Sequence, residues 1–260
     1  MDQMNYIRIE ALIDRYDYAG VIEILEKMDQ VDKNLIKLIY SCKHAMNFDF
    51  KLAYYELSGI ENLSSNKKLT NLKKNLQELI DGRADAIFSE LIENTKMQLE
   101  NRRYIDFLSR VYRLKEAILK YIFVKNHVDK RKFSFRTEAV SKRMILKVLR
   151  KKYKIHNPNL SFAISNYMNK YLKDPRYEDV LKILNSNKIN EIIELRHESI
   201  AGHGFIGVNR KDLVNIYGNP QGIIGDFCDV LERVGVSIRV NKYDKINAYI
   251  IELLKTMSIS

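Results

Sequence analysis

Residues 102–125 read RRYIDFLSRVYRLKEAILKYIFVK, and this stretch decides the fold class. Its apolar side chains recur every three or four residues, which places them on one wide face of a long helix. That face consists of Tyr104, Phe107, Leu108, Val111, Leu114, Ile118, Leu119, Ile122 and Phe123. The arginines and lysines of the stretch fall mostly on the other positions. The pattern therefore predicts a long helix that packs on one side, at the start of a second domain.

The segments before this stretch carry the same helical period in shorter pieces. Asp17, Asp32 and Asp49 each precede one of them and are suited to be N-caps, because an aspartate side chain accepts a hydrogen bond from the first free amides of a helix. A longer pattern from Thr70 to Glu100 predicts one helix with a bend at Gly82. The N-terminal part is therefore expected to be a helical bundle.

Helical patterns continue to the end of the chain, so we expect two all-α domains, over residues 1–100 and 101–260. The exception is 236–240, where apolar and polar residues alternate, which predicts at most one short strand or hairpin. No succession of strand–helix units is present, and a Rossmann-like nucleotide domain is therefore not encoded here. The expected fold class is all-α.

Charge is distributed unevenly along the chain, whose formal net charge is +11. Residues 102–154 hold 18 Lys+Arg against 4 Asp+Glu, so this basic block is strongly positive while the rest is slightly acidic. Concentrated positive charge indicates an anionic partner, most simply nucleic acid. A lysine-rich solvated surface would give the same composition without any partner.

Composition also argues against several functional classes. No apolar run approaches the length of a membrane span, and the N-terminus lacks a signal-peptide pattern, so a cytoplasmic protein without membrane contact is expected. The two cysteines, Cys42 and Cys228, are too few for a disulfide framework. The five histidines and two cysteines show no metal-ligand spacing, and no glycine-rich phosphate loop follows a strand. We therefore expect no metal and no cofactor.

The candidate chemistry lies in residues 191–210, EIIELRHESIAGHGFIGVNR. Arg196 closes an apolar-periodic helix pattern, and His203 follows between Gly202 and Gly204. A free imidazole has a pKa of about 6.5 and moves protons near neutral pH, whereas a guanidinium stays charged and binds phosphate in a bidentate way. The two groups together suit cleavage of a phosphodiester.

The spacing of this Arg–His pair is not informative by itself, since Arg150 and His156 are spaced similarly. That second pair lies in a lysine-rich segment before a proline, as expected of a solvated helix end. Arg196 and His203 lie instead between an apolar helix and an apolar turn, where buried polar groups need partners or a function. The structural alternative is that Arg196 pairs with a neighbouring glutamate and that His203 caps a helix.

Residues 195–205, LRHESIAGHGF, and 106–118, DFLSRVYRLKEAI, carry a family resemblance. They are similar to HEPN-domain ribonucleases, most closely to the accessory ribonuclease of type III-A CRISPR systems. The resemblance implies an all-α, HEPN-like nuclease domain over 101–260 that forms a homodimer with a composite active site. It further implies metal-independent endoribonuclease activity on single-stranded RNA in antiviral defence, with Arg196 and His203 as the catalytic pair.

The chain departs from the family pattern at two points. Family members commonly carry Asn directly after the arginine, where this chain has His197, which would orient Arg196, contact RNA or be an ordinary polar surface residue. Family members also usually begin with a Rossmann-like domain that senses cyclic oligoadenylate. No segment here has that pattern, so cyclic oligoadenylate sensing is not expected. The chain would then be a fragment of a sensor–nuclease or a shorter form with another trigger.

The expected reaction uses the RNA 2′-OH as the nucleophile. His203 would transfer protons and Arg196 would stabilise charge on the phosphate, an effect typically worth about 10²–10³ in rate. The products would be a 2′,3′-cyclic phosphate and a 5′-OH. Two alternatives remain open from the sequence. One is a non-catalytic helical adaptor that binds RNA or protein, and the other is a HEPN toxin or abortive-infection ribonuclease outside CRISPR systems.

Overall fold

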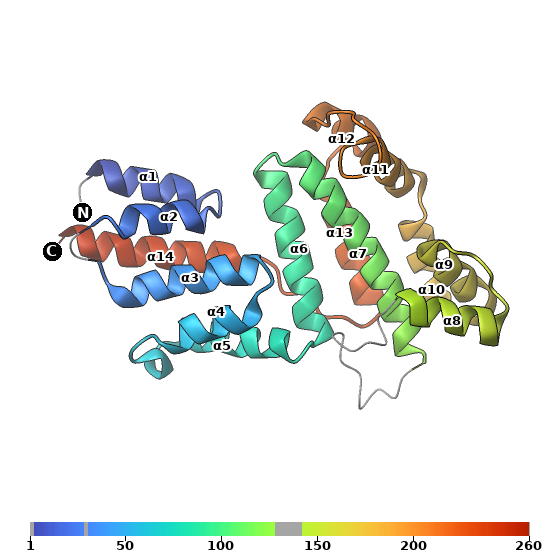
Figure 1. The fold of residues 1–260 in the computed structure, drawn as a ribbon, viewed down its shortest axis with the longest axis horizontal. Helices are drawn as coiled ribbons and strands as arrows, with labels where there is room; N and C mark the ends of the chain where they lie inside the picture. Colours follow the sequence, from blue (N-terminus) through green and yellow to red (C-terminus); the bar gives the residue numbers. More distant parts are fainter. Residues whose placement is uncertain (1–2, 29–30, 128–141, 260) are drawn as a thin grey trace. The chain divides into compact units, whose positions relative to one another are not determined.

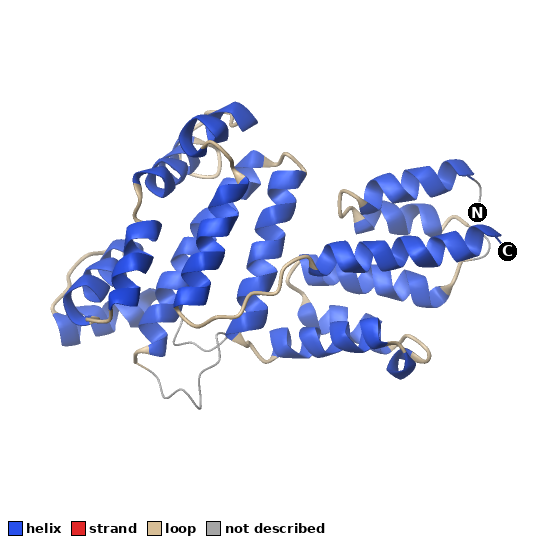
Figure 2. Ribbon diagram, turned by 180° about the vertical axis from the view of Figure 1, so that it is seen from behind, coloured by secondary structure: helices blue, strands red, loops and turns tan. Residues whose placement is uncertain are grey.

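The computed structural model describes residues 3–28, 31–127 and 142–259. This part of the chain contains fourteen α-helices and one 3₁₀ turn. Figure 2 shows helices joined by loops, with no strand among the described residues. The expected all-α fold class is confirmed. Segment 236–240 forms no strand within the described residues. Its Arg239 amide donates to Ser89 Oγ at 2.9 Å.

The helices divide between two compact units, which are 1–86 with 240–260, and 87–239. Unit 1 holds α1 (Gln3–Ile13), α2 (Tyr18–Leu25), α3 (Lys33–Met46), α4 (Phe50–Ser58), η1 (Leu63–Ser65), α5 (Lys67–Ile80) and α14 (Lys242–Ile259). Unit 2 holds most of α6 (Ala84–Glu100), then α7 (Tyr104–Lys125), α8 (Lys142–Tyr153), α9 (Leu160–Tyr171), α10 (Pro175–Leu184), α11 (Asn187–Glu198), α12 (Arg210–Tyr217) and α13 (Gln221–Arg233).

In unit 1 each helix packs on its neighbour in sequence, from α1 through to α5. The last helix, α14, returns to this unit and contacts α1, and Figure 1 shows it in red among the blue helices. The expected domain boundary between residues 100 and 101 remains a prediction. The compact units divide between residues 86 and 87 and again between 239 and 240. Local sequence patterns gave no sign that the last helix packs with the first.

Helix starts are as expected where the sequence offers a capping side chain. The carboxylates of Asp17, Asp32 and Asp49 accept hydrogen bonds from the amides of the first turns of α2, α3 and α4. Asp174 caps α10 in the same way, directly before the proline at its first position. These local interactions explain why the helix boundaries could be read from the sequence.

The expected single helix from Thr70 to Glu100 is two helices, α5 and α6. Gly82 lies between them with a φ of 70°, a left-handed conformation that glycine adopts without strain. The chain therefore breaks into two helices at Gly82, where a bend within one helix was expected.

Helix α7 is the centre of unit 2, because it contacts α9, α11 and α13. The apolar face expected from its sequence is buried from Phe107 to Phe123, and only Tyr104 remains partly exposed. Burying several large apolar side chains, each worth roughly 1.5–3 kcal/mol, makes this helix the main source of packing energy in the unit. None of the described helices is both long and apolar enough to cross a membrane.

A buried polar pair joins the two ends of the chain in unit 1. Tyr18 donates its hydroxyl to Asn247 Oδ1 at 2.7 Å, and Asn247 Nδ2 donates to the Ile13 carbonyl at 2.9 Å. Both bonds are buried, so loss of the amide would remove two buried hydrogen bonds.

Asn247→Ala is therefore expected to lower the free energy of unfolding of unit 1 by about 1–3 kcal/mol. Urea unfolding measures this change. Lys245→Ala, an exposed substitution on the same helix, is the matched control and should change stability by less than about 0.5 kcal/mol. Equal effects of the two substitutions would contradict a structural role for the buried pair.

Candidate functional site

Helix α11 carries the candidate residues and is anchored on α7. Ser186 caps its start by accepting a hydrogen bond from the Ile189 amide, and Ile189 and Ile192 are fully buried. Lys115 of α7 is also buried and donates from Nζ to Asn190 Oδ1 at 3.3 Å. Burial lowers the pKa of Lys115 to about 8. The last turn of α11, with Arg196 and His197, is thereby held at a defined place above α7.

After α11 the chain turns back onto the carbonyls that end the helix. The amides of His203 and Gly204 both donate to the His197 carbonyl, at 3.0 and 3.1 Å, and the Ile206 amide donates to the Glu198 carbonyl at 3.0 Å. Ser199 and Ile206 form an isolated parallel bridge. These bonds satisfy carbonyls that a helix end otherwise leaves without partners.

Two glycines make this return possible. A Cβ atom on Gly202 would lie 2.4 Å from the His197 carbonyl oxygen, and one on Gly204 would lie 1.9 Å from that of Glu198. Both distances are far below van der Waals contact, so only glycine allows the turn to approach the helix this closely. The reason for glycine here is close approach to backbone, and not a left-handed φ, which neither residue has.

The guanidinium of Arg196 lies over the ring of Tyr112, with Cζ 4.8 Å from the ring centroid. At this distance the charge is attracted to the aromatic face. One terminal nitrogen, NH1, is 3.3 Å from His197 Nδ1. The Nε atom is buried and has no hydrogen-bond partner among the described residues. The side chain is therefore oriented but has donor capacity left over.

The three predicted site residues end in different environments. His197 lies with Arg196, because its ring also packs edge-on against Tyr112 with centroids 6.1 Å apart. His203 is exposed, and in the described part of the chain its ring has no hydrogen bond or ion pair. His203 caps the end of α11 through its backbone amide. Arg196 has no carboxylate partner among the described residues. The glutamate pairing of the structural alternative is therefore not present in the described residues, whereas its helix cap is present through the His203 backbone and not through the ring.

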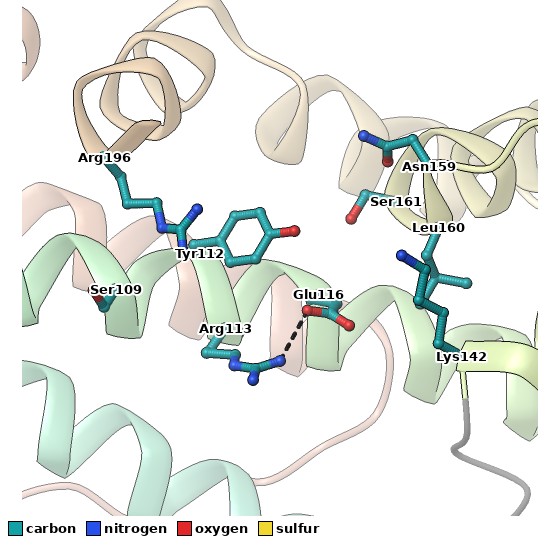
Figure 3. A pocket seen from close by; sticks show the side chains of 9 residues that line it. All are labelled: Ser109, Tyr112, Arg113, Glu116, Lys142, Asn159, Leu160, Ser161 and Arg196. Carbon is teal, nitrogen blue, oxygen red and sulfur yellow. Dashed lines mark hydrogen bonds and ion pairs between the residues drawn. The ribbon is translucent and has the colours of Figure 1, made fainter. Parts of the chain in front are cut away.

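Arg196 faces a polar pocket of about 380 Å³ within unit 2. Figure 3 shows Arg196 descending from α11 onto Tyr112, with the start of α9 on the opposite side and Lys142 reaching in from α8. The lining residues are Ser109, Tyr112, Arg113, Glu116, Lys142, Asn159, Leu160, Ser161 and Arg196. The pocket thus collects residues from four helices around one cationic side chain that was expected to act.

Several of these lining residues were not identified from the sequence. Ser109, Tyr112 and Glu116 are spaced so that they share one face of α7, which is a signal that periodicity could have given. Asn159 before an apolar run is a recognisable N-cap, and its side chain accepts from the Phe162 amide. Nothing in the sequence indicated that the start of α9 would lie opposite Arg196.

The described part of the basic block supplies an exposed cationic face on α8. Ile145 and Leu149 are buried against the unit, while Arg143, Lys147 and Arg150 are exposed. The expected basic loop Lys130–Arg136 lies outside the described residues. Exposed aromatic surface accompanies the charge, because Tyr171 is 47% exposed and its ring lies 4.8 Å from that of Tyr153. Charge beside aromatic rings is typical of single-strand binding surfaces.

Sequence comparisons assign no family to this chain. No protein-family model matches it, and no curated protein matches it in sequence. Among the residues that the structure describes, no cluster of three or more His, Cys, Asp or Glu side chains could hold a metal ion. The function therefore has to be argued from the geometry of this site.

The close approach of the turn generates a sharp prediction. Gly204→Ala places a methyl group against the Glu198 carbonyl, so the turn must move, and we expect a loss of about 1–3 kcal/mol in unfolding free energy. Urea unfolding measures the loss, and the His203 amide resonance should shift as its hydrogen bond to His197 breaks.

Gly207→Ala is the matched control, because a Cβ atom at Gly207 meets nothing within 4 Å. It should change stability by no more than about 0.5 kcal/mol and leave the His203 amide unchanged. A Gly204→Ala protein as stable as the Gly207→Ala protein would show that the turn does not need the close approach.

Proposed function

We propose that this chain is a metal-independent endoribonuclease that cleaves single-stranded RNA. The observation that carries the proposal is the free donor capacity of Arg196, whose guanidinium faces a polar pocket without a carboxylate partner in the described residues. A cation held in this way is suited to bind a phosphate oxygen. The resemblance of residues 195–205 to HEPN ribonucleases supports the same assignment.

The proposed reaction uses the chemistry of the Arg196 and His203 side chains. The 2′-OH attacks the adjacent phosphorus while the bond from phosphorus to the 5′-oxygen breaks, which leaves a 2′,3′-cyclic phosphate and a 5′-OH. His203 takes the proton from the 2′-OH or gives one to the leaving oxygen, and Arg196 stabilises the charge on the phosphate. His197, beside Arg196, would keep the guanidinium oriented. Such a reaction needs no metal ion.

A second copy of the chain would complete the site. Ile200, Phe205 and Ile206 flank His203 and are 70%, 93% and 55% exposed. Large apolar side chains this exposed in one turn are typical of an interaction surface. A two-fold dimer through this turn would bring both copies of His203 together, so that one acts as base and the other as acid. The resemblance implies a dimer of this kind.

The exposed α8 face would bind the RNA backbone in this proposal, and falling affinity with added salt is its expected signature. The biological setting that fits best is antiviral defence of the CRISPR type III kind, in the cytoplasm. A HEPN toxin or abortive-infection ribonuclease would use the same residues with a different trigger.

The decisive experiment incubates the purified chain with labelled single-stranded RNA in the presence of EDTA. Cleavage should continue under chelation and leave cyclic-phosphate ends. Arg196→Ala and His203→Ala should each reduce the rate by about 10² or more, because each removes a group that acts in the transition state. Gel analysis of the products measures both results.

The chain offers its own control in the second Arg–His pair. His156→Ala changes the histidine of that pair, which is exposed and lies outside the α8 face, and the variant should cleave at a rate close to that of the unmodified protein. Dependence on a divalent metal, or full activity in His203→Ala, would reject the proposed reaction. Salt-sensitive RNA binding without any cleavage would favour the non-catalytic adaptor instead.

The dimer is tested separately with Phe205→Ser. Since Phe205 is 93% exposed in the single chain, the variant should fold normally but sediment as a monomer and lose cleavage. Phe162→Ser, at another exposed phenylalanine of unit 2, should remain dimeric. Sedimentation equilibrium gives the mass directly. A monomeric unmodified protein with full activity would contradict a shared active site.

A further inference from the structure

The pocket beneath Arg196 has features of an anion site that the cleavage chemistry alone does not use. Arg196 Nε is buried without an acceptor in the described part of the chain. Leaving a buried donor unpaired costs about 1–3 kcal/mol, so native proteins rarely keep one without a reason. Nε itself is covered, so an acceptor that enters the pocket meets the terminal nitrogens of the same guanidinium. Because a guanidinium is always charged, the favoured acceptor is an anion.

The opposite wall of the pocket presents further donors at the start of α9. Asn159 Oδ1 accepts from the Phe162 amide, which leaves the preceding amides of Leu160 and Ser161 without acceptors among the described residues. The positive end of the helix dipole is at the same place, and anions bind at such helix starts. The Ser161 side chain also lines the pocket.

The pocket lining has more cationic side chains than carboxylates. Glu116 is already neutralised, because Arg113 lies 3.2 Å from one of its oxygens and Lys120 lies 2.7 Å from the other. Figure 3 shows the ion pair between Arg113 and Glu116, both on α7. Arg196 and Lys142 therefore remain as uncompensated cations, from α11 and α8. Lys142 has no ion pair among the described residues.

We propose that this pocket is a binding site for one phosphate group of a nucleotide, with Arg196 and Lys142 as its cations and the first amides of α9 as its neutral donors. A tetrahedral anion suits donors that converge from several helices, since its oxygens point in different directions. A volume of about 380 Å³ leaves room for more than the phosphate alone, so part of the sugar or base can enter with it.

The choice of a nucleotide as ligand rests on the proposed function. Two sources share this chemistry, namely an internal phosphodiester of an RNA strand and the terminal phosphate of a mononucleotide. The ribonuclease proposal favours the internal phosphodiester, because the strand must pass Arg196 to be cleaved. Lys142, Leu160 and Ser161 would then anchor the strand without taking part in proton transfer.

The test is an NMR titration of the isotope-labelled full chain with three probes. These are a 2′-O-methylated adenine dinucleotide without terminal phosphate, adenosine monophosphate, and adenosine. The dinucleotide should shift the amide resonances of Leu160 and Ser161, and adenosine should not. A response to the monophosphate alone would still support a phosphate site, but assign it to a terminal phosphate. No response of these amides to either phosphate probe would overturn the proposal.

Lys142→Gln should weaken binding of the responding probe roughly tenfold, since it removes one charged hydrogen-bond donor. Lys211→Gln changes an exposed lysine of unit 2 that neither lies on the α8 face nor lines the pocket, and its affinity should equal that of the unmodified chain. Equal affinity of all three proteins would overturn the assignment of Lys142. Equal weakening in both variants would show general charge attraction and not a site.

The two proposals fail in distinguishable ways, because the titration requires no cleavage. If RNA stays intact while the Leu160 and Ser161 amides respond, the ribonuclease proposal is rejected and the phosphate-site proposal stands. RNA cleaved with dependence on Arg196 and His203, while these amides stay silent, would remove only the phosphate site.

Discussion

The close packing of one turn against the end of α11 is the constraint on which the candidate site depends. Gly202 and Gly204 lie so near the last carbonyls of the helix that no side chain fits between them. The same approach lets three amides bond to carbonyls that would otherwise be unsatisfied. As a result His203 is presented on a rigid turn, and the neighbouring apolar side chains are forced outward. The position of His203 and the exposure of its apolar neighbours therefore have one structural cause.

Arg196 shows how a site can be ordered and still incomplete. The Tyr112 ring and His197 orient its guanidinium, and α7 positions both α11 and the ring beneath it. Orientation by an aromatic face costs no hydrogen-bond donors, whereas an ion pair with a carboxylate would use them. The buried, unpaired Nε lowers the folding free energy gained, and the terminal nitrogens of the guanidinium remain to meet the pocket. Preorganised donors of this kind are what phosphate chemistry requires.

Local sequence was sufficient wherever neighbouring residues along the chain decide the outcome. Helix periods, the caps at Asp17, Asp32 and Asp49, and the buried face of α7 all follow from contacts within about four residues. The break at Gly82 was only half anticipated, since a bend and a complete break of a helix have the same local signal. Segment 236–240 alternates like a strand but forms none in the described part of the chain, because alternation cannot supply a partner strand.

The sequence by itself determined the all-α class, most helix boundaries, and the presence of Arg196 and His203 beside two glycines. Only the tertiary structure decided that Tyr112 lies under Arg196, that the start of α9 and Lys142 complete its pocket, and that α14 packs with α1. The physical reason is the distance along the sequence over which the interactions act. Periodicity and capping report interactions along one helix, whereas a pocket forms where helices far apart in sequence pack together, and that depends on the shape of the whole core.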